Sequence, residues 1–268
     1  MKDYIVVSFS GGKDSTAMLL RMIELGEHID EVICCDTTKE FPAMYRHIAK
    51  VMKVVEDAGI KFTMLKAKHD FDHYMYDHTP ERRRNSECAD MRGLSWPKVR
   101  MRWCTGIFKE RPIKAYFKQK KQQYNVIQCI GLAADEVYRL ERAHNQQEGH
   151  RHPLVEWGWT EADCLKYCYD HGFDWEGLYE IFGRVSCWCC PLQGLGELRK
   201  LREHFPDLWA ELKDMDEKAW TPFHPRYSVQ DLEIRFQLEE EMQAQGLPTS
   251  GHSKVFREAL KARLEETR

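Results

Sequence analysis

The sequence predicts an α/β protein with a doubly wound parallel sheet, followed by a mostly helical C-terminal extension that contains cysteines. Short apolar runs alternate with helical patterns over the first 130 residues, and helical patterns dominate after residue 194. Strands are expected at residues 4–8, 31–35, 61–65 and 125–130. Helices are expected at residues 14–25, 42–58 and 110–121. Ligands of such sheets bind at the carboxyl ends of the strands, so functional residues are expected there.

The later chain departs from this alternation. Residues 1–192 are expected to form a nucleotide-binding domain, and residues 193–268 a helical extension that includes a helix at 229–244. The stretch 69–111 is long and interrupted by prolines, which is typical of a functional insertion. A capping box at Thr160 predicts a further helix that ends near residue 171.

Composition narrows the class of protein. The chain has 268 residues and a net charge of −3, and no apolar run approaches the roughly 20 residues of a membrane span. No signal peptide is evident, so a cytoplasmic protein that does not bind membranes is expected. Ten cysteines then favour metal or redox chemistry over disulfides.

Charge is concentrated in one region. Residues 81–121 contain thirteen Lys or Arg against four Asp or Glu. Such a block indicates an anionic partner, such as a nucleic acid that contacts residues 82–121, with Arg82, Arg83 and Arg84 at the rim. A solvated charged face is the alternative.

The most informative motif is the stretch 8–16, which reads Ser-Phe-Ser-Gly-Gly-Lys-Asp-Ser-Thr between the first strand and the first helix. Gly11 and Gly12 let the backbone approach a ligand, and amides at a helix start favour anions. Serine hydroxyls add donors and Lys13 adds a positive charge. The sequence therefore predicts a phosphate site, against the alternative of a turn that only caps a helix.

Other residues are open to two interpretations. Asp36 follows the second strand and could bind Mg²⁺ or ribose, or accept backbone N–H groups. Arg139 and Arg142 could clamp a phosphate or pair with Glu136 or Glu141. Cys187-x-x-Cys190 has a ligand spacing used by zinc and by iron–sulfur clusters, but one pair cannot complete a site.

Ser10 to Ser15 resembles the PP-loop of the ATP pyrophosphatases, and four later segments resemble the phosphoadenosine phosphosulfate (PAPS) reductase family. The resemblance covers roughly residues 4–192, and its segments are Asp36–Pro42, Arg102–Ile113, Gly131–Arg139 and Pro153–Trp157. It implies an adenine nucleotide alpha-hydrolase-like (HUP-type) fold that binds ATP and releases pyrophosphate. Thr38 replaces the family's usual glycine, so that turn is expected to differ. Ala133 replaces an arginine and leaves the second substrate open.

The resemblance also implies roles for individual residues. With ATP and Mg²⁺ bound, Lys13, Asp14 and Asp36 are expected to be catalytic. The residues expected to bind the nucleotide are Ser8, Ser10, Gly11, Gly12, Lys13, Asp14, Ser15, Asp36, Thr37, Gly131, Glu136 and Arg139.

Three cysteines match the family's cluster ligands. The resemblance implies that Cys104, Cys187 and Cys190 hold a [4Fe–4S] cluster with one open iron, as in the PP-loop tRNA thiolases. Cys189 or Cys88 could supply a fourth ligand, and a closed zinc site is the alternative. The four cysteines in apolar patterns are expected to be core residues, whereas Cys35 is open; these four are Cys34, Cys129, Cys164 and Cys168.

Together these features predict an ATP-dependent, adenylating sulfur transferase that acts on a nucleic acid or nucleotide and receives sulfur from a donor protein. The sulfur-inserting subunit of DNA phosphorothioation systems is similar in combining this loop with cluster cysteines. A PAPS or adenylylsulfate reductase is the alternative, although no cysteine follows Cys190 to act as its mobile nucleophile. An enzyme like the ATP sulfurylase small subunit and a non-catalytic nucleotide- and zinc-binding module also remain.

Overall fold

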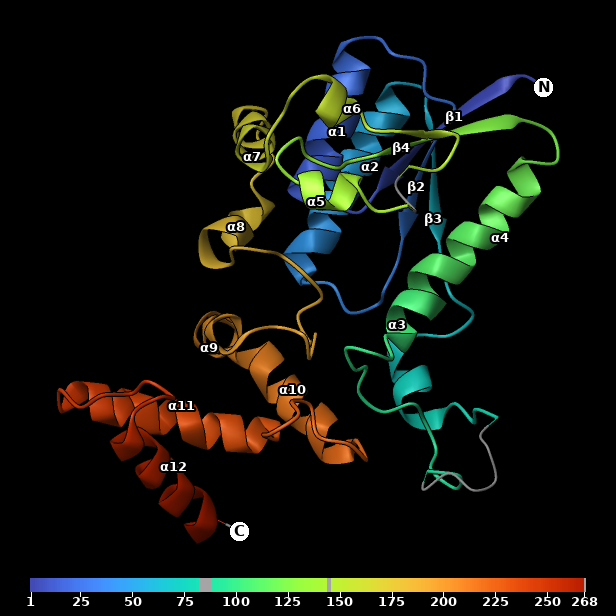
Figure 1. The fold of residues 1–268 in the computed structure, drawn as a ribbon. Coiled ribbons are helices and arrows are strands. Elements are labelled where there is room, and N and C mark those ends of the chain that lie inside the picture. Colours follow the sequence, from blue (N-terminus) through green and yellow to red (C-terminus); the bar gives the residue numbers. More distant parts are fainter. Residues whose placement is uncertain (82–87, 144–145, 268) are drawn as a thin grey trace. The chain divides into compact units, whose positions relative to one another are not determined.

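The computed structural model describes residues 1–81, 88–143 and 146–267, and it contains a five-stranded parallel sheet (Figure 1). The strand order is β3-β2-β1-β4-β5. The first three strands are added toward one edge of the sheet and the last two toward the other, so the switch in strand order lies between β1 and β4. The strands are β1 (Asp3–Phe9), β2 (Glu31–Cys35), β3 (Lys61–Leu65), β4 (Asn125–Ile130) and β5 (His150–Arg151). The predicted doubly wound parallel sheet is confirmed.

The short strand β5 is not among the strands expected from the sequence. Its two residues pair with Gln128 and Cys129 of β4. A strand of two residues is too short to show an alternating pattern, so only its neighbour in the sheet defines it.

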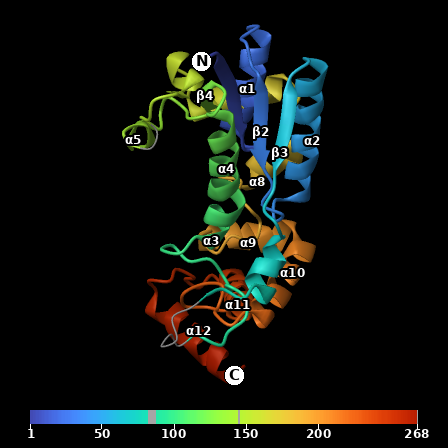
Figure 2. The same ribbon diagram turned by 90° about the vertical axis from the view of Figure 1, so that its right-hand side faces the viewer.

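Helices cover both faces of the sheet (Figure 2). On one face, α1 (Lys13–Glu24) and α2 (Pro42–Asp57) follow β1 and β2, and the ring of Phe9 lies 6.3 Å from His47 of α2. On the other face, Tyr116 and Phe117 of α4 (Arg111–Lys120) pack on Val6, Ile33 and Val126. Alternate residues of the strands therefore reach opposite helical layers.

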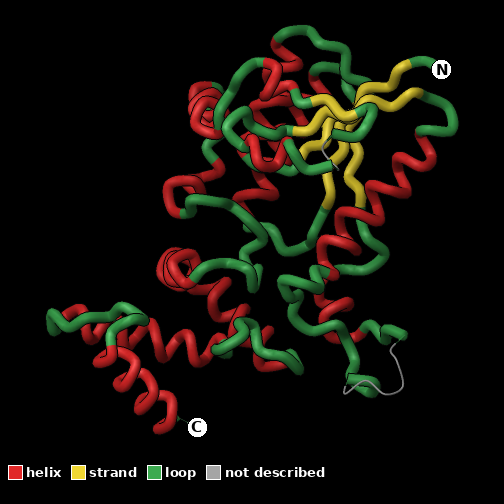
Figure 3. The backbone as a smooth tube through the Cα atoms, viewed as in Figure 1, coloured by secondary structure: helices red, strands yellow, loops and turns green. Residues whose placement is uncertain are grey.

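Short helices complete this part of the chain (Figure 3). They are α3 (Trp103–Thr105), α5 (Val137–Leu140), α6 (Pro153–Glu156), α7 (Glu161–Asp170) and α8 (Leu178–Ile181). The predicted capping box is confirmed, because Thr160 Oγ1 accepts from the amide of Asp163 at 3.2 Å and the Asp163 carboxylate accepts from the Thr160 amide at 2.9 Å.

The chain forms two compact units, one of residues 1–71 and 102–187 and the other of residues 72–101 and 188–268. Residues 72–101 of the predicted insertion therefore fold with the C-terminal helices. These helices are α9 (Leu195–His204), α10 (Pro206–Lys218), α11 (Val229–Ala244) and α12 (Lys254–Glu266). The basic cluster Arg82, Arg83 and Arg84 lies outside the described residues. Among the helices described, none is both long and apolar enough to cross a bilayer.

A buried carboxylate organises each unit. In the first, the Glu31 side chain is fully buried and accepts from Tyr4 and Tyr116, each at 2.8 Å, and from Lys120 at 2.7 Å. Burial alone would raise the pKa of Glu31, but hydrogen bonds, led by that of Lys120, hold it well below its usual range.

In the second unit, Asp216 joins the insertion to the C-terminal helices. Its carboxylate accepts from Trp96 Nε1 at 2.9 Å, from the Phe223 amide at 2.7 Å and from the Val229 amide at 2.6 Å. Burial raises the pKa of Asp216, because these neutral donors offset only part of the cost of an ionised carboxylate.

Candidate nucleotide site and cysteine ligands

The phosphate loop joins β1 to α1 at the carboxyl edge of the sheet. Gly11 has a left-handed φ of 81°, and a Cβ there would lie 2.7 Å from Met44 Sδ. Trp175 Nε1 donates to the Gly11 carbonyl at 2.7 Å, and this bond restrains the backbone of the loop. Gly12 is the N-cap of α1 and has no side-chain oxygen to accept from the first helical amides, the first of which, that of Lys13, donates to Tyr179 Oη at 3.0 Å.

The serine hydroxyls of the loop are engaged with the loop itself. Ser15 Oγ accepts from the Ser10 amide at 3.1 Å and donates to the Gly12 carbonyl at 3.0 Å. Ser8, in β1, accepts from Gln128 Nε2 at 2.8 Å and so faces β4 within the sheet. The bonds of Ser15 hold the loop in its bent conformation.

The end of β4 approaches the loop closely. A Cβ at Gly131 would lie 2.8 Å from Ser15 Cα, so only glycine permits this packing. The structure thus brings Gly131 to the phosphate loop, as a close contact between two backbones.

Lys13 is held by carboxylates. Its Nζ lies 2.5 Å from Glu161 Oε2 and 3.2 Å from Asp14 Oδ1, and its side chain is 13% exposed. Burial opposes the charge of Lys13, yet the two carboxylates raise its pKa above the usual value. Glu161, at the start of α7, is a contact that the sequence analysis missed.

Acidic groups outnumber cations around Asp14. Burial raises the pKa of Asp14, Lys13 lowers it, and Glu161 and Glu136 raise it further. Glu136 is 7% exposed and pairs with Arg139, which is one of the alternatives that the sequence leaves open. Within the described ranges, Glu136 Oε2 is buried without a hydrogen-bond partner. Carboxylates with spare oxygens suit Mg²⁺, although no three His, Cys, Asp or Glu side chains of the described residues are preassembled to hold a metal.

Asp36 lies at the end of β2, the strand next to β1. Its Oδ1 accepts from the Thr38 amide at 2.8 Å and from Tyr45 Oη at 3.1 Å. Thr38 has a φ of 60°, the left-handed conformation that glycine favours, and its Oγ1 accepts from the Phe71 amide at 2.9 Å. The threonine is therefore held in a backbone conformation that a glycine would adopt freely.

A buried thiol contacts the same turn. Cys187 Sγ lies 3.3 Å from Glu40 Oε1 and 3.5 Å from Thr37 Oγ1, and Thr37 donates to Glu40 at 2.8 Å. Burial raises the pKa of the Cys187 thiol. A protonated thiol therefore lies beside Thr37, the residue that follows Asp36, at the carboxyl edge of the sheet.

Lys109 supplies positive charge to these sulfurs. Burial opposes its charge, but nearby acidic groups raise its pKa; in order, they are Cys187, Glu40, Cys35 and Cys104. The sequence analysis missed Glu40 and Lys109 as site residues, although both lie inside the segments that it quotes for the family. A carboxylate and an ammonium inside these two family segments are the sequence features that could have indicated site residues.

The predicted cluster ligands are divided between the units. Cys104 and Cys187 belong to the first unit, whereas Cys88, Cys189 and Cys190 belong to the second. Ten free cysteines are present. The prediction of core cysteines is confirmed, because each of these four side chains is at most 1% exposed: Cys34, Cys129, Cys164 and Cys168.

Comparisons with known proteins found distant relatives of this chain. Two proteins of Methanocaldococcus jannaschii, the uncharacterized proteins MJ0066 and MJ0973, are each 25% identical to the chain over 80% of its length. The matched part of the chain spans 42% and 48% of the length of these relatives. A solved structure, the U34-tRNA thiolase NcsA from Methanococcus maripaludis with its [4Fe-4S] cluster, has 15% identity and a TM-score of 0.38. That match covers 81% of this chain and 71% of the thiolase, but at this distance it carries no argument about ligand or reaction.

A family model gives the assignment. The phosphoadenosine phosphosulfate reductase domain matches residues 4–193, which include the phosphate loop, the Asp36 turn and the Cys187–Cys190 pair. The chain therefore belongs to the phosphoadenosine phosphosulfate reductase domain family.

Proposed function

We propose that this protein is an ATP-dependent sulfur transferase that adenylates a nucleic acid or nucleotide and then replaces the adenylate with sulfur. The observation that carries the proposal is the adjacency of two chemistries at one edge of the sheet. The phosphate loop follows β1, and the turn that hydrogen-bonds to the Cys187 thiol follows the neighbouring strand β2.

The loop accounts for the adenylation step. An acceptor oxygen attacks the α-phosphorus of ATP, the bond from that phosphorus to the β-phosphate oxygen breaks, and pyrophosphate leaves. The amides at the start of α1 and the Lys13 ammonium would stabilise the leaving pyrophosphate. Lys13 can do so only by exchanging Glu161 for a phosphate oxygen, and Asp14 and Glu136 then face the Mg²⁺ that accompanies ATP.

The cysteines account for the sulfur. Cys104, Cys187 and Cys190 would hold a [4Fe–4S] cluster, which supplies an iron with no protein ligand at which sulfide can be carried. The first unit fits this role, because Glu40 is placed to accept the Cys187 proton and the Lys109 charge favours the resulting thiolate. A sulfide nucleophile then attacks the carbon that bears the adenylate, the carbon–oxygen bond breaks, and AMP leaves.

The test measures metal content and pyrophosphate in the same preparation. Protein purified and reconstituted without oxygen should contain iron and acid-labile sulfide, and should release pyrophosphate from ATP when sulfide and an RNA acceptor are present. Cys104→Ala and Cys187→Ala should each lose the iron. Cys129→Ala is the control, because Cys129 is a free cysteine that lies in the sheet, away from the proposed ligands in sequence.

Stoichiometric zinc without sulfide, together with ATP binding but no pyrophosphate release, would replace the proposal with the non-catalytic module. Sulfite produced from an adenylylsulfate in the absence of any RNA would replace it with a reductase.

A further inference from the structure

The second unit contains a pocket of about 1410 Å³ that none of the residues discussed above contributes to. It is lined by α9, α11 and α12 and by the segments 224–227 and 249–252. We propose that this pocket binds the sugar–phosphate backbone and bases of a single-stranded nucleic acid. The inference extends the proposed function, because it gives the nucleic-acid acceptor a binding surface. It rests on the proposed function only for the statement that the bound nucleic acid is the acceptor.

The pocket contains an excess of positive charge. Glu239 Oε2 lies 2.5 Å from Arg199 Nε, and Glu239 Oε1 lies 2.9 Å from Arg235 Nε. Within the described residues, this is the one carboxylate that pairs with either guanidinium; the side chains of Arg235 and Glu239 are 8% and 6% exposed, whereas that of Arg199 is 42% exposed. Arg235 and Glu239 therefore balance each other, and Arg199 adds a solvent-accessible positive charge that would attract an anion.

Donors at the pocket remain available to a ligand. Arg235 Nη1 donates to Tyr227 Oη at 3.3 Å, and Nη2 has no hydrogen bond to a described residue. Arg226 and Arg257 are exposed, line the pocket and form no ion pair with any described side chain. Forked guanidinium donors suit phosphate oxygens.

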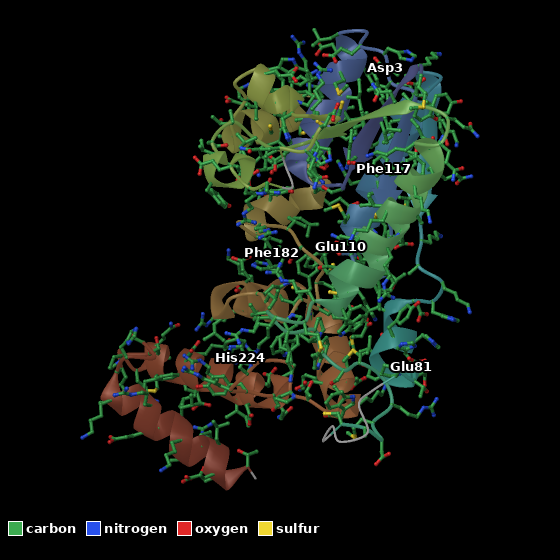
Figure 4. The ribbon with its side chains drawn as sticks, turned by 45° about the vertical axis from the view of Figure 1, so that its right-hand side comes forward. Asp3, Glu81, Glu110, Phe117, Phe182 and His224 are labelled. Atoms are coloured by element: carbon green, nitrogen blue, oxygen red, sulfur yellow. The ribbon has the colours of Figure 1, made fainter. Side chains whose placement is uncertain are left out.

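The charge of the pocket contrasts with that of its surroundings. Five Lys or Arg and two Glu line it, whereas the whole chain has a net charge of −3. Burial lowers the pKa of His224, and Arg226 and Arg235 lower it further, as expected where positive potential accumulates. Figure 4 labels His224, which precedes α11 in the chain.

Aromatic rings indicate which polyanion fits. The rings of His224 and Tyr227 are stacked, with centroids 5.6 Å apart and planes at 20°, and the Arg235 guanidinium lies 5.6 Å from the Tyr227 ring. Stacking surfaces beside arginines are typical of proteins that bind unpaired bases. The volume also exceeds the roughly 300–1,000 Å³ of small-molecule pockets, which favours several nucleotides over one.

The experiment measures binding of a fluorescein-labelled 12-nucleotide single-stranded RNA to the full chain by fluorescence anisotropy, without ATP or iron. The variant Arg226→Gln/Arg257→Gln removes two exposed charges and no buried contact. It should weaken binding at least tenfold at low salt and should make the dependence on salt less steep by about one to two units of slope.

Two double variants serve as controls. Lys218→Gln/Lys254→Gln removes the same charge from the same unit outside the pocket, and should change affinity less than twofold. Lys98→Gln/Arg100→Gln removes exposed charge from the insertion, and should also leave most of the affinity.

Unchanged affinity of Arg226→Gln/Arg257→Gln would overturn the inference, and loss of binding in Lys98→Gln/Arg100→Gln alone would move the surface to the insertion. Displacement of the RNA by AMP or inorganic phosphate at equal phosphate concentration would also overturn it, because it would indicate a small-anion site. RNA binding in the absence of pyrophosphate release would instead contradict the proposed reaction and leave this inference intact.

Discussion

The phosphate loop of the first unit and the pocket of the second differ in how they balance charge. In the loop, the one lysine is held by two carboxylates, Asp14 and Glu161. In the pocket, two arginines share the single carboxylate of Glu239. A ligand of the loop must therefore displace an existing ion pair, which favours a phosphate chain with high charge density and its metal. A ligand of the pocket meets positive charges that outnumber the carboxylates. Its affinity should therefore depend strongly on salt concentration and less on a single binding geometry.

The largest expected effect separates the two sites. Lys13→Ala should lower ATP-dependent pyrophosphate release about a thousandfold, because it removes the charge opposite the leaving group. RNA binding by the same variant should equal that of the wild type, since Lys13 does not line the pocket. Lys53→Ala, at an exposed position of α2, is the control and should leave both quantities unchanged. Equal pyrophosphate release by all three proteins would remove the loop from the mechanism.

The next prediction compares the two buried carboxylates. Glu31→Gln should destabilise the first unit by about 3 kcal/mol, because it removes the negative charge that balances Lys120 and replaces one of the two acceptor oxygens with a donor. Hydrogen exchange read by mass spectrometry would report this loss in β1 and β2. The exposed Glu56→Gln on α2 should change stability by less than about 0.5 kcal/mol.

Acid should act on this unit through the same residue. The pKa of folded Glu31 is lowered, so its contribution to stability is present above the pKa of an unfolded glutamate and is lost as the pH falls below that value. Exchange in β1 and β2 that stays equally slow from pH 7 to about pH 3, after correction for the intrinsic rate, would contradict this account.

Asp216 should behave in the opposite sense with a smaller effect. The pKa of folded Asp216 is raised, so its contribution is largest below the usual aspartate pKa and declines as the pH rises through the folded value. Asp216→Asn should cost about 1–3 kcal/mol in the second unit, since the amide cannot accept from all three donors, and should remove this decline. A variant that keeps the pH dependence would assign it to another group.

The smallest expected effect tests the ion pair between Lys13 of the loop and Glu161. Glu161→Gln should tighten ATP binding about two- to fivefold, because the Lys13–Glu161 pair is partly exposed and is worth roughly 1 kcal/mol or less. Calorimetric titration with ATP and Mg²⁺ would measure it, with Glu56→Gln as the control. Weaker binding would show that Glu161 serves the metal more than it restrains the lysine.

The bounds of several strands and helices and the place of the phosphate loop could be predicted from local sequence patterns. Strands β2, β3 and β4 and helix α11 begin and end where the sequence predicts, and the phosphate loop lies between β1 and α1. These features depend on periodicity, capping and glycine conformation within a few residues, all of which can be read along the chain.

The ion-pair partners of the site residues follow from the tertiary structure and cannot be read from local sequence patterns. Lys13 meets Glu161 from 148 positions away, and Arg199 meets Glu239 across 40 positions. The sequence predicts the insertion at 69–111 but not that residues 72–101 fold with the C-terminal helices. It also gives residues 197–241 an acidic balance of twelve Asp or Glu to seven Lys or Arg, within which the structure gathers arginines at one pocket. Local patterns fix how each segment folds, whereas the pairing of charges follows from how helices pack, and that depends on contacts between residues far apart in the chain.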